Sequence, residues 1–332
     1  MDAEPPSAAA PPPGPRQTAA ATPLLPLACR RITLRRLQPQ DLTAFQAYRH
    51  EPLVAHTGHL HRLLALLLAG LLLSLHFTAR AEDQPAADAR ARAAVEASGY
   101  AGNVLLYDIA GQTWRAADPA LVDEAFIPAS TFKIFSALVA LESGVISDIE
   151  TVIKWDGVSR DRVEINRDLD LRSAFRLSAV PHFQGLVRQI GAAQMQRYID
   201  ATGYGNQDIS GDTDTFWLTG KLRISPRQQV KFLTRLYQGQ LPFSSSSINA
   251  VKTLMAMEVD PHYILRAKTG WAVLEGNQNT GWWVGWVERG DQVLVFATVL
   301  QGVQPGADFG PARLNVTRQA LGPEWLGQQK NH

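Results

Sequence analysis

Apolar and polar positions along the second half of the chain follow the strand period, then the helix period, then the strand period again. Residues 103–108 and 112–115 carry β-forming side chains on either side of an Ala-Gly pair, which predicts a hairpin. Residues 131–141 are apolar nearly all the way round, so they predict a buried helix.

The middle of this region, residues 149–256, follows the helix period. Three segments show it most clearly: 184–190, 192–202 and 226–239. Gly203 and Gly239 stand where a left-handed C-cap residue belongs. Ser225 and Pro226 suit the N-cap and the first turn of the third helix.

The strand period returns at residues 263–268, 281–288 and 291–300, with Gly290 marking a hairpin turn. Residues 312–326 predict a closing helix. Strands at both ends with helices between them predict one sheet built from both chain ends, with a helical region inserted. The expected fold class is therefore α/β (α+β), an antiparallel sheet flanked by helices.

The start of the chain has a different composition. Residues 1–59 open with Ala/Pro-rich sequence of the kind that stays disordered. Residues 60–81 hold a short basic flank, an apolar run and Ala-Arg-Ala, which predicts a secretory signal peptide cleaved after Ala81. The run falls short of the ~20 residues of a membrane span, so no stable anchor is expected. Residues 82–332 would then form an exported domain, periplasmic in a Gram-negative bacterium.

Residues 31–58 combine an alternating strand pattern with an N-capped helix pattern. They resemble the opening strand and helix of a GNAT acetyltransferase. The acetyl-CoA loop pattern of that family does not follow in the same region, and one strand with one helix cannot make such an enzyme. We interpret this stretch as a vestigial fragment and hypothesise that translation begins near Val54 or Leu60.

Composition excludes several classes of function. The net charge is +1, which gives no reason to expect nucleic acid or an anionic membrane as a partner. The only cysteine, Cys29, precedes the predicted signal peptide, so the domain contains no disulfide. The eight histidines show no metal-ligand spacing, and no metal is expected.

Ser130 and Lys133 form a Ser-x-x-Lys sequence at the start of the predicted helix 131–141. This spacing puts hydroxyl and amine on one helix face. A serine hydroxyl needs a neighbouring base to become a nucleophile. Because a lysine in such an apolar helix is costly to bury, it requires a chemical reason. The pair predicts an acyl-transfer site.

Two further motifs follow in order: Ser178-Ala179-Val180 and Lys268-Thr269-Gly270. Ser-x-x-Lys, a second serine motif and Lys-Thr-Gly are the pattern of β-lactamases and penicillin-binding proteins. Four longer segments narrow the resemblance: 204–206 (Tyr-Gly-Asn), 216–218 (Phe-Trp-Leu), 222–226 (Leu-Arg-Ile-Ser-Pro) and 281–287 (Gly-Trp-Trp-Val-Gly-Trp-Val). Together they closely resemble the class D, oxacillinase-type serine β-lactamases, from about residue 103 to at least residue 297.

The resemblance implies a role for each catalytic residue. Ser130 would attack the lactam carbonyl and carry the acyl group. Lys133 would carry a carbamate formed from carbon dioxide and would act as the general base, and no cofactor is expected beyond this modification. Trp217 would hold the carbamate through its indole N–H, and Val180 would pack over it. Ser178 would relay a proton to the leaving nitrogen.

The resemblance also implies five substrate-binding residues: Lys268, Thr269, Gly270, Trp271 and Arg313. The lysine and the threonine would hold the substrate carboxylate, with Arg313 as a second anchor. The backbone N–H groups of Ser130 and Trp271 would form the oxyanion hole. Tyr204 and Asn206 are expected to support the structure near the site.

Two alternatives share the three motifs. A penicillin-binding transpeptidase or carboxypeptidase would be acylated without fast deacylation, and a β-lactam sensor domain would bind covalently and signal. The expected partner is a small β-lactam in every case. The sequence leaves open whether the protein is a monomer or a homodimer, and whether carbapenems or cephalosporins are good substrates.

Overall fold

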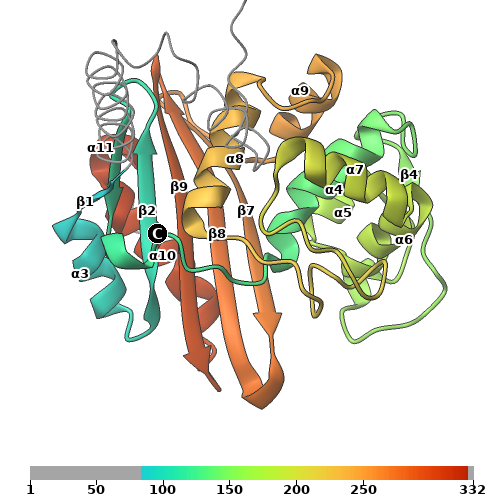
Figure 1. Ribbon diagram of the computed structural model, residues 1–332, viewed down its shortest axis with the longest axis horizontal. Helices are drawn as coiled ribbons and strands as arrows, with labels where there is room; N and C mark the ends of the chain where they lie inside the picture. Colours follow the sequence, from blue (N-terminus) through green and yellow to red (C-terminus); the bar gives the residue numbers. More distant parts are fainter. Residues whose placement is uncertain (1–83, 328–332) are drawn as a thin grey trace, which may run out of the picture. The chain divides into compact units, whose positions relative to one another are not determined.

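The computed structural model describes residues 84–327, so the predictions for residues 1–59 and 60–81 lie outside the described residues. A seven-stranded sheet runs through this part of the chain (Figure 1). From one edge to the other its strands are β1 (Ala86–Ala87), β3 (Thr113–Ala116), β2 (Ala101–Asp108), β9 (Gln292–Val303), β8 (Gln278–Arg289), β7 (Ile264–Val273) and β6 (Ala256–Val259). β2 from the start of the domain pairs with β9 from its end, which confirms a sheet built from both chain ends.

The sheet is not wholly antiparallel as expected. β1 pairs with β3 in the parallel direction, although all the other pairs are antiparallel. β1 has only two residues and contributes two register pairs, so the sequence offers no hydrophobic period from which it could be predicted. The difference is confined to one edge.

β7 continues five residues beyond the predicted end of its strand at residue 268. Gly270 and Ala272 weaken the β signal there, but pairing with β8 continues to Val273. The Lys-Thr-Gly motif therefore lies inside a strand. At the other end of β8, the predicted turn at Gly290 is confirmed, with φ of 56°.

Three helices cover one face of the sheet: α3 (Ala89–Ala97), α10 (Phe309–Leu321) and α11 (Pro323–Leu326). The prediction of one closing helix over residues 312–326 is wrong, because the chain breaks at Gly322. This residue has φ of 75° and is followed by Pro323, which starts the short helix α11. A glycine C-cap and a proline first turn together separate two helices.

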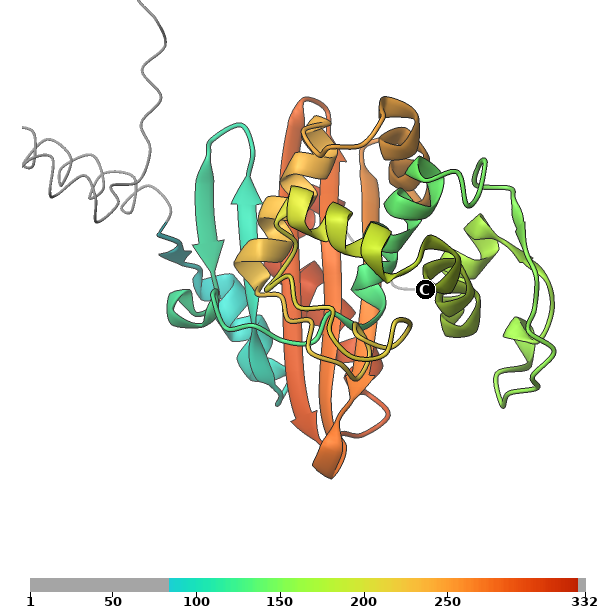
Figure 2. The same ribbon diagram turned by 45° about the vertical axis from the view of Figure 1, so that its right-hand side comes forward.

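The other face is covered by α8 (Pro226–Gln238) and the inserted helical region, which Figure 2 shows beside the strands. The region predicted at residues 149–256 holds α8 and also α5 (Leu171–Arg176), α6 (Val180–Ile190), α7 (Ala192–Thr202) and α9 (Ser245–Leu254), and α4 (Phe132–Glu142) precedes it. A two-stranded sheet of β4 (Val152–Ile153) and β5 (Leu169–Asp170) lies within it. The predicted inserted helical region is confirmed.

The caps of α7 and α8 agree with the sequence prediction. Gly203 and Gly239 end these helices in the left-handed conformation. Ser225 accepts a hydrogen bond from the backbone N–H of Gln228, whose side chain in turn accepts from the N–H of Ser225. Such a capping box satisfies two backbone donors that the helix itself leaves unpaired.

α4 runs through the interior, and its residues from Phe132 to Ala140 are buried. The ring of Phe132 stacks on Trp217 with centroids 5.3 Å apart and meets Tyr204 and Phe216 edge-on. Each such side chain stabilises the fold by about 1.5–3 kcal/mol through burial. Rigid aromatic packing of this kind holds the start of α4 in place. Of the helices within residues 84–327, none has the length and apolar character needed to cross a bilayer.

Candidate active site

The turn that carries Ser130 is fixed by its neighbours. Ser130 lies in the 3-10 helix η3 (Ala129–Thr131), which leads directly into α4. Ala129 has φ of 49°, an uncommon value for a residue with a side chain. Its N–H donates to the carbonyl of Trp217 at 3.0 Å, which holds the turn in this conformation. The turn presents a nearly buried Ser130 at the start of the helix.

Lys133 lies fully buried and donates from Nζ to Oγ of Ser130 at 2.9 Å. The ring of Phe183 lies 5.4 Å from Nζ. Within residues 84–327, no carboxylate forms an ion pair with this lysine. Burial, and then the positive charges of Lys268 and Arg162, hold the pKa of Lys133 well below its usual value. The neutral amine is therefore favoured, and only the neutral amine can accept a proton.

Ser178 lies in the link between α5 and α6, with φ of 53°. Its Oγ accepts a hydrogen bond from Nζ of Lys268 at 3.0 Å. The structure thus joins the second and third motifs directly, while the first motif is linked internally by the Ser130–Lys133 bond. Val180 begins α6 two residues later and is half-buried.

Lys268 lies on β7, where Nζ also donates to the carbonyl of Thr269 at 3.0 Å and lies 5.5 Å from the ring of Phe175. Burial, together with the charges of Arg313 and Arg162, lowers the pKa of Lys268 to about 7. The ammonium of Lys268 therefore loses its proton readily near neutral pH unless an anion binds beside it. A substrate carboxylate is such an anion.

Gly270 lets β7 approach the turn of Ser130. A Cβ on this glycine would lie 3.0 Å from the carbonyl oxygen of Pro128, 3.0 Å from Cγ2 of Thr131 and 3.2 Å from the backbone nitrogen of Thr131. At these distances the neighbouring atoms would have to give by a few tenths of an ångström, so a larger residue would press the strand away from the nucleophile. This close approach explains on steric grounds why the third motif has glycine at position 270.

Arg313 lies on α10, and its guanidinium donates to the carbonyl of Gly270 and lies 5.3 Å from the ring of Trp271. Burial lowers the pKa of Arg313 to about 10, at which it is still a cation at neutral pH. The indole of Trp271 is 42% exposed and donates to Oδ1 of Asn279 at 2.7 Å. The predicted second anchor therefore lies beside the third motif.

Trp217 is buried against Phe132, and its indole N–H has no acceptor within the described residues. A buried donor without a partner costs about 1–3 kcal/mol. A carbamate on Lys133, the neighbour of Phe132, would bring carboxylate oxygens to this part of the core. The unpaired indole therefore fits the carbamate group that the resemblance implies.

The two residues expected to be structural do support the framework. Asn206 accepts from the N–H of Arg223 at 2.9 Å and donates to the carbonyl of Lys221 at 3.0 Å. Tyr204 is buried between Phe132 and Phe135. Neither takes part in the contacts among the three motifs.

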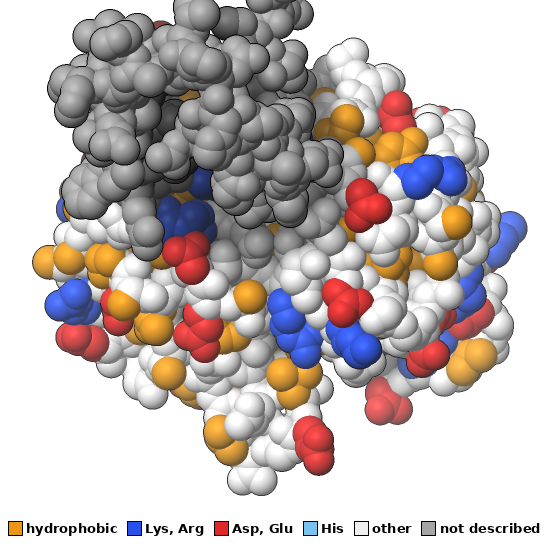
Figure 3. Space-filling model, viewed as in Figure 1, with side chains coloured by type: hydrophobic (Ala, Val, Ile, Leu, Met, Phe, Trp, Pro, Cys, Tyr) orange, Lys and Arg blue, Asp and Glu red, His pale blue; other side chains and the backbone are white. Residues whose placement is uncertain are grey.

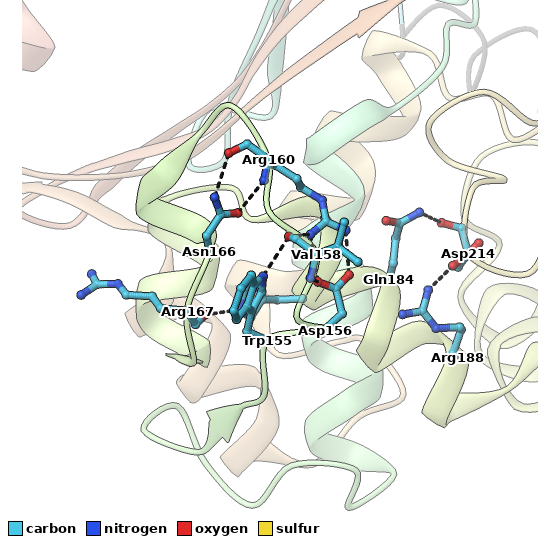
Figure 4. A network of polar contacts seen from close by, with 10 residues as sticks. Trp155, Asp156, Val158, Arg160, Asn166, Arg167, Gln184, Arg188 and Asp214 are labelled. Carbon is cyan, nitrogen blue, oxygen red and sulfur yellow. Dashed lines mark hydrogen bonds and ion pairs between the residues drawn. The ribbon is translucent and has the colours of Figure 1, made fainter.

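Arg162 belongs to none of the motifs and was not predicted as a site residue. It lies in the loop between β4 and β5 and donates to the carbonyl of Leu177 at 2.9 Å, next to Ser178. Figure 4 shows how this loop is held: Arg160 pairs with Asp156 through two hydrogen bonds, and Asn166 exchanges two with the backbone of Arg160. The charge of Arg162 contributes to the lowered pKa of both buried lysines.

The chain matches a family model over residues 94–322, that of the penicillin binding protein transpeptidase domain. It is 45% identical to Beta-lactamase OXA-48 from Klebsiella pneumoniae over 202 residues, 61% of this chain and 75% of that protein. It is 40% identical over 192 residues to the regulatory protein BlaR1 of Bacillus licheniformis, which is 58% of this chain but 32% of that protein.

Solved structures agree with these matches. The class D β-lactamase YbXI from Nostoc superposes with a TM-score of 0.66 at 41% identity, covering 69% of this chain and 95% of that one. The fold and the three connected motifs define a serine acyl-transfer enzyme of the penicillin-binding type. Within that type, the chain belongs to the class D serine β-lactamases.

Proposed function

We propose that this protein hydrolyses β-lactam antibiotics of the penicillin and oxacillin type through an acyl group on Ser130, and so confers resistance to them. The observation that carries the proposal is the fully buried, unpaired Lys133, whose Nζ lies 2.9 Å from Oγ of Ser130. A structural lysine would have a carboxylate partner or a solvent-exposed amine. A neutral amine at this distance can take the serine proton.

The acylation step follows from these contacts. Oγ of Ser130 bonds to the lactam carbonyl carbon while its proton moves to the base on Lys133. The carbonyl carbon–nitrogen bond then breaks, and the nitrogen takes a proton through Oγ of Ser178. Lys268, hydrogen-bonded to Ser178, holds that hydroxyl in place. The positive end of α4 and the N–H groups of Ser130 and Trp271 stabilise the oxyanion.

The substrate carboxylate would lie against Lys268 and Thr269, with the guanidinium of Arg313 behind Gly270. Two groups on β7 and a third on the neighbouring helix α10 can together orient the ring before attack. Pre-orientation of this kind lowers the entropic part of the barrier.

A carbamate on Lys133 would supply the base for acylation and for activation of the deacylating water. Several residues of this chain favour it. The apolar surroundings keep the amine of Lys133 neutral, which is the form that reacts with carbon dioxide. Trp217 offers an unpaired indole N–H as a donor, and we assign to Val180, half-buried at the start of α6, the role of limiting water that the resemblance implies.

Turnover of nitrocefin tests the proposed reaction. Sustained hydrolysis at many moles of product per mole of protein is expected. A single stoichiometric burst would instead favour a penicillin-binding protein or a covalent sensor. The sensor is a real alternative because of the 40% identity to the regulatory protein BlaR1. A mass increase on Ser130 that persists for hours would support it.

Bicarbonate tests the carbamate separately. Removal of bicarbonate from the buffer is expected to lower turnover, and its return is expected to restore it. Turnover that is unaffected by bicarbonate would contradict the carbamate while leaving the Ser130 acyl group intact. ¹³C-labelled bicarbonate should give a carbamate signal that is absent in a Lys133→Met variant.

We further propose export to the periplasm by the signal peptide at residues 60–81. The apolar run and the Ala-Arg-Ala site support this proposal. Intact-mass analysis of protein from the periplasmic fraction is expected to give a chain that begins at Glu82. A mature form that retains residues before His61 would overturn it.

A further inference from the structure

A groove of about 430 Å³ opens beside the third motif. It extends from Lys268 and Thr269 on β7 toward the last turn of α5 and the junction of α9 with β6. Two arginines line it, Arg172 and Arg176, together with mostly apolar side chains. These other lining residues are Phe175, Thr253, Leu254, Ala256, Met257 and Ala267.

The groove begins where the pairing of β7 with β6 ends. β6 pairs with β7 only over Ile264–Arg266, and the N–H of Ala267 bonds to the carbonyl of Met255 at 2.8 Å. Lys268 and Thr269 follow directly and belong both to the groove and to the expected carboxylate site. A substrate held there by its carboxylate therefore has the groove next to it.

The charges in the groove are all positive. Arg172 pairs with Glu150 at 2.6 Å, so its charge is partly balanced. Arg176 stands in the last turn of α5, and the structure shows no ion pair for it within residues 84–327. No acidic residue lines the groove. A guanidinium fork matches the two oxygens of a carboxylate or sulfonate.

We propose that this groove is a subsite for an anionic substituent on the β-lactam ring system, with Arg176 as the residue that selects it. In a cephalosporin the carboxylate and the 3-substituent stand on neighbouring ring carbons. A carboxylate bound at Lys268 and Thr269 therefore directs the 3-substituent into the groove, where Phe175, Leu254 and Met257 contact its apolar part. The inference rests on the proposed hydrolysis and names a substrate class for it, the dianionic cephalosporins.

The test uses two cephalosporins that share one acylamino side chain and differ only in the end of the 3-substituent, a carboxylate in one and a primary amide in the other. The readout is the ratio of their kcat/KM values. Wild type is expected to favour the carboxylate. In Arg176→Gln the ratio should fall about two- to fivefold, the range for one partly exposed charge pair.

Arg197→Gln is the matched control, because Arg197 is an exposed arginine on α7 that does not line the groove. It should keep the wild-type ratio. Met257→Arg adds a second cation to the groove and should raise the ratio by a similar factor. High salt should reduce the preference in wild type but leave Arg176→Gln nearly unchanged.

The outcomes separate the two proposals. No turnover of either compound would refute the proposed hydrolysis. Turnover of both compounds with a ratio that is the same in wild type, Arg176→Gln and Met257→Arg would refute the subsite alone. A ratio that falls equally in Arg197→Gln would show a general charge effect and would also refute it.

Discussion

Two regions of this molecule differ in how their charged side chains are paired. In the interior, Lys133 and Lys268 are buried, and their hydrogen bonds go to serine hydroxyls and a carbonyl. In the loop between β4 and β5, Lys154 pairs with Asp168 at 2.7 Å and Arg160 pairs with Asp156 at 2.6 Å. In the loop, these ion pairs stabilise the backbone conformation, and they are exposed to solvent. Figure 3 shows both signs of charge scattered over one face of the molecule, as expected for such surface pairs.

The difference in pairing affects both the stability of the fold and the reactivity of the lysine amines. An exposed ion pair is screened and contributes little to stability. A buried amine without an acid loses solvation and gains no partner, so its neutral form is favoured. Burial of these amines therefore lowers stability and favours their neutral form, the form in which Lys133 can act as a base. Substitutions in the two regions should therefore separate activity from stability.

The largest effect is expected for Lys133→Met. Loss of the base should lower kcat/KM for nitrocefin at least about a thousandfold. The melting temperature should stay the same or rise, because a flexible apolar side chain replaces an unpaired amine. Lys154→Met is the control in the loop and should keep kcat/KM within about twofold. A Lys133→Met protein that is fully active, or one that is unfolded, would contradict the different roles of charge in the interior and in the loop.

Trp217→Phe should have the next largest effect. It removes the indole N–H that would hold the proposed carbamate, so turnover at low bicarbonate should fall about 10- to 100-fold, and a high bicarbonate concentration should partly restore it. Trp283→Phe is the matched control, since Trp283 also has a buried indole N–H without an acceptor in the described residues but packs in the cluster on the opposite face of the sheet. Equal bicarbonate dependence in both variants would contradict the role of Trp217.

The pKa of Lys268 near 7 predicts a pH dependence of stability. An unfolded lysine titrates near ~10.4, so between about pH 7 and 10 the unfolded state binds more protons than the folded state. The free energy of unfolding should therefore rise with pH in this window, by about 1.4 kcal/mol per pH unit for one such group. Urea unfolding in bicarbonate-free buffer measures it.

In Lys268→Met the slope of the unfolding free energy against pH should be smaller by about 1.4 kcal/mol per pH unit, the contribution of one titrating group. Lys154→Met should retain the wild-type slope. The sign provides a strict check. If stability instead fell as pH rose from 7 to 10, Lys268 would have to be a favourably paired cation, contrary to its surroundings in the structure.

The smallest effect is expected for Asp156→Asn in the loop. The carboxyl accepts two hydrogen bonds from Arg160, which hold the pKa of Asp156 well below its usual value. Because the group is exposed, its loss should change kcat/KM by less than about twofold. Faster amide hydrogen exchange around Val158 and Arg160 should report local loosening. A large loss of activity would show that the loop shapes the site more than its surface position suggests.

Much of the chemistry was predictable because motifs fix residue types at fixed spacing. Ser130, Lys133 and Lys268 follow from such motifs, and the structure connects Ser178 to Lys268. Arg313, predicted as the second anchor although the sequence before α10 is irregular, lies on α10 and donates to the carbonyl of Gly270. The roles assigned to these residues in catalysis stay predictions until the variants are measured.

Other features depend on contacts between distant segments. Arg162 reaches the site through the carbonyl of Leu177, fifteen residues away, and no local pattern marks that contact. The left-handed φ of Ala129 and Ser178 is set by hydrogen bonds and packing, and neither residue is a glycine. Helix α9 was not predicted separately because its Ser-rich start is typical of a loop, yet Ser244 caps it. Propensity alone cannot decide such cases.

The close approach at Gly270 also limits how this enzyme can change during evolution. Even an alanine there would lie 3.0–3.2 Å from atoms of the turn that carries the nucleophile, so substitution at this position acts directly on the distance between strand and serine. Variants selected by new antibiotics should therefore arise where side chains have room, at Trp271 and along the groove beside Arg176. Because this close contact fixes the catalytic geometry, adaptive substitutions are expected at the rim of the site.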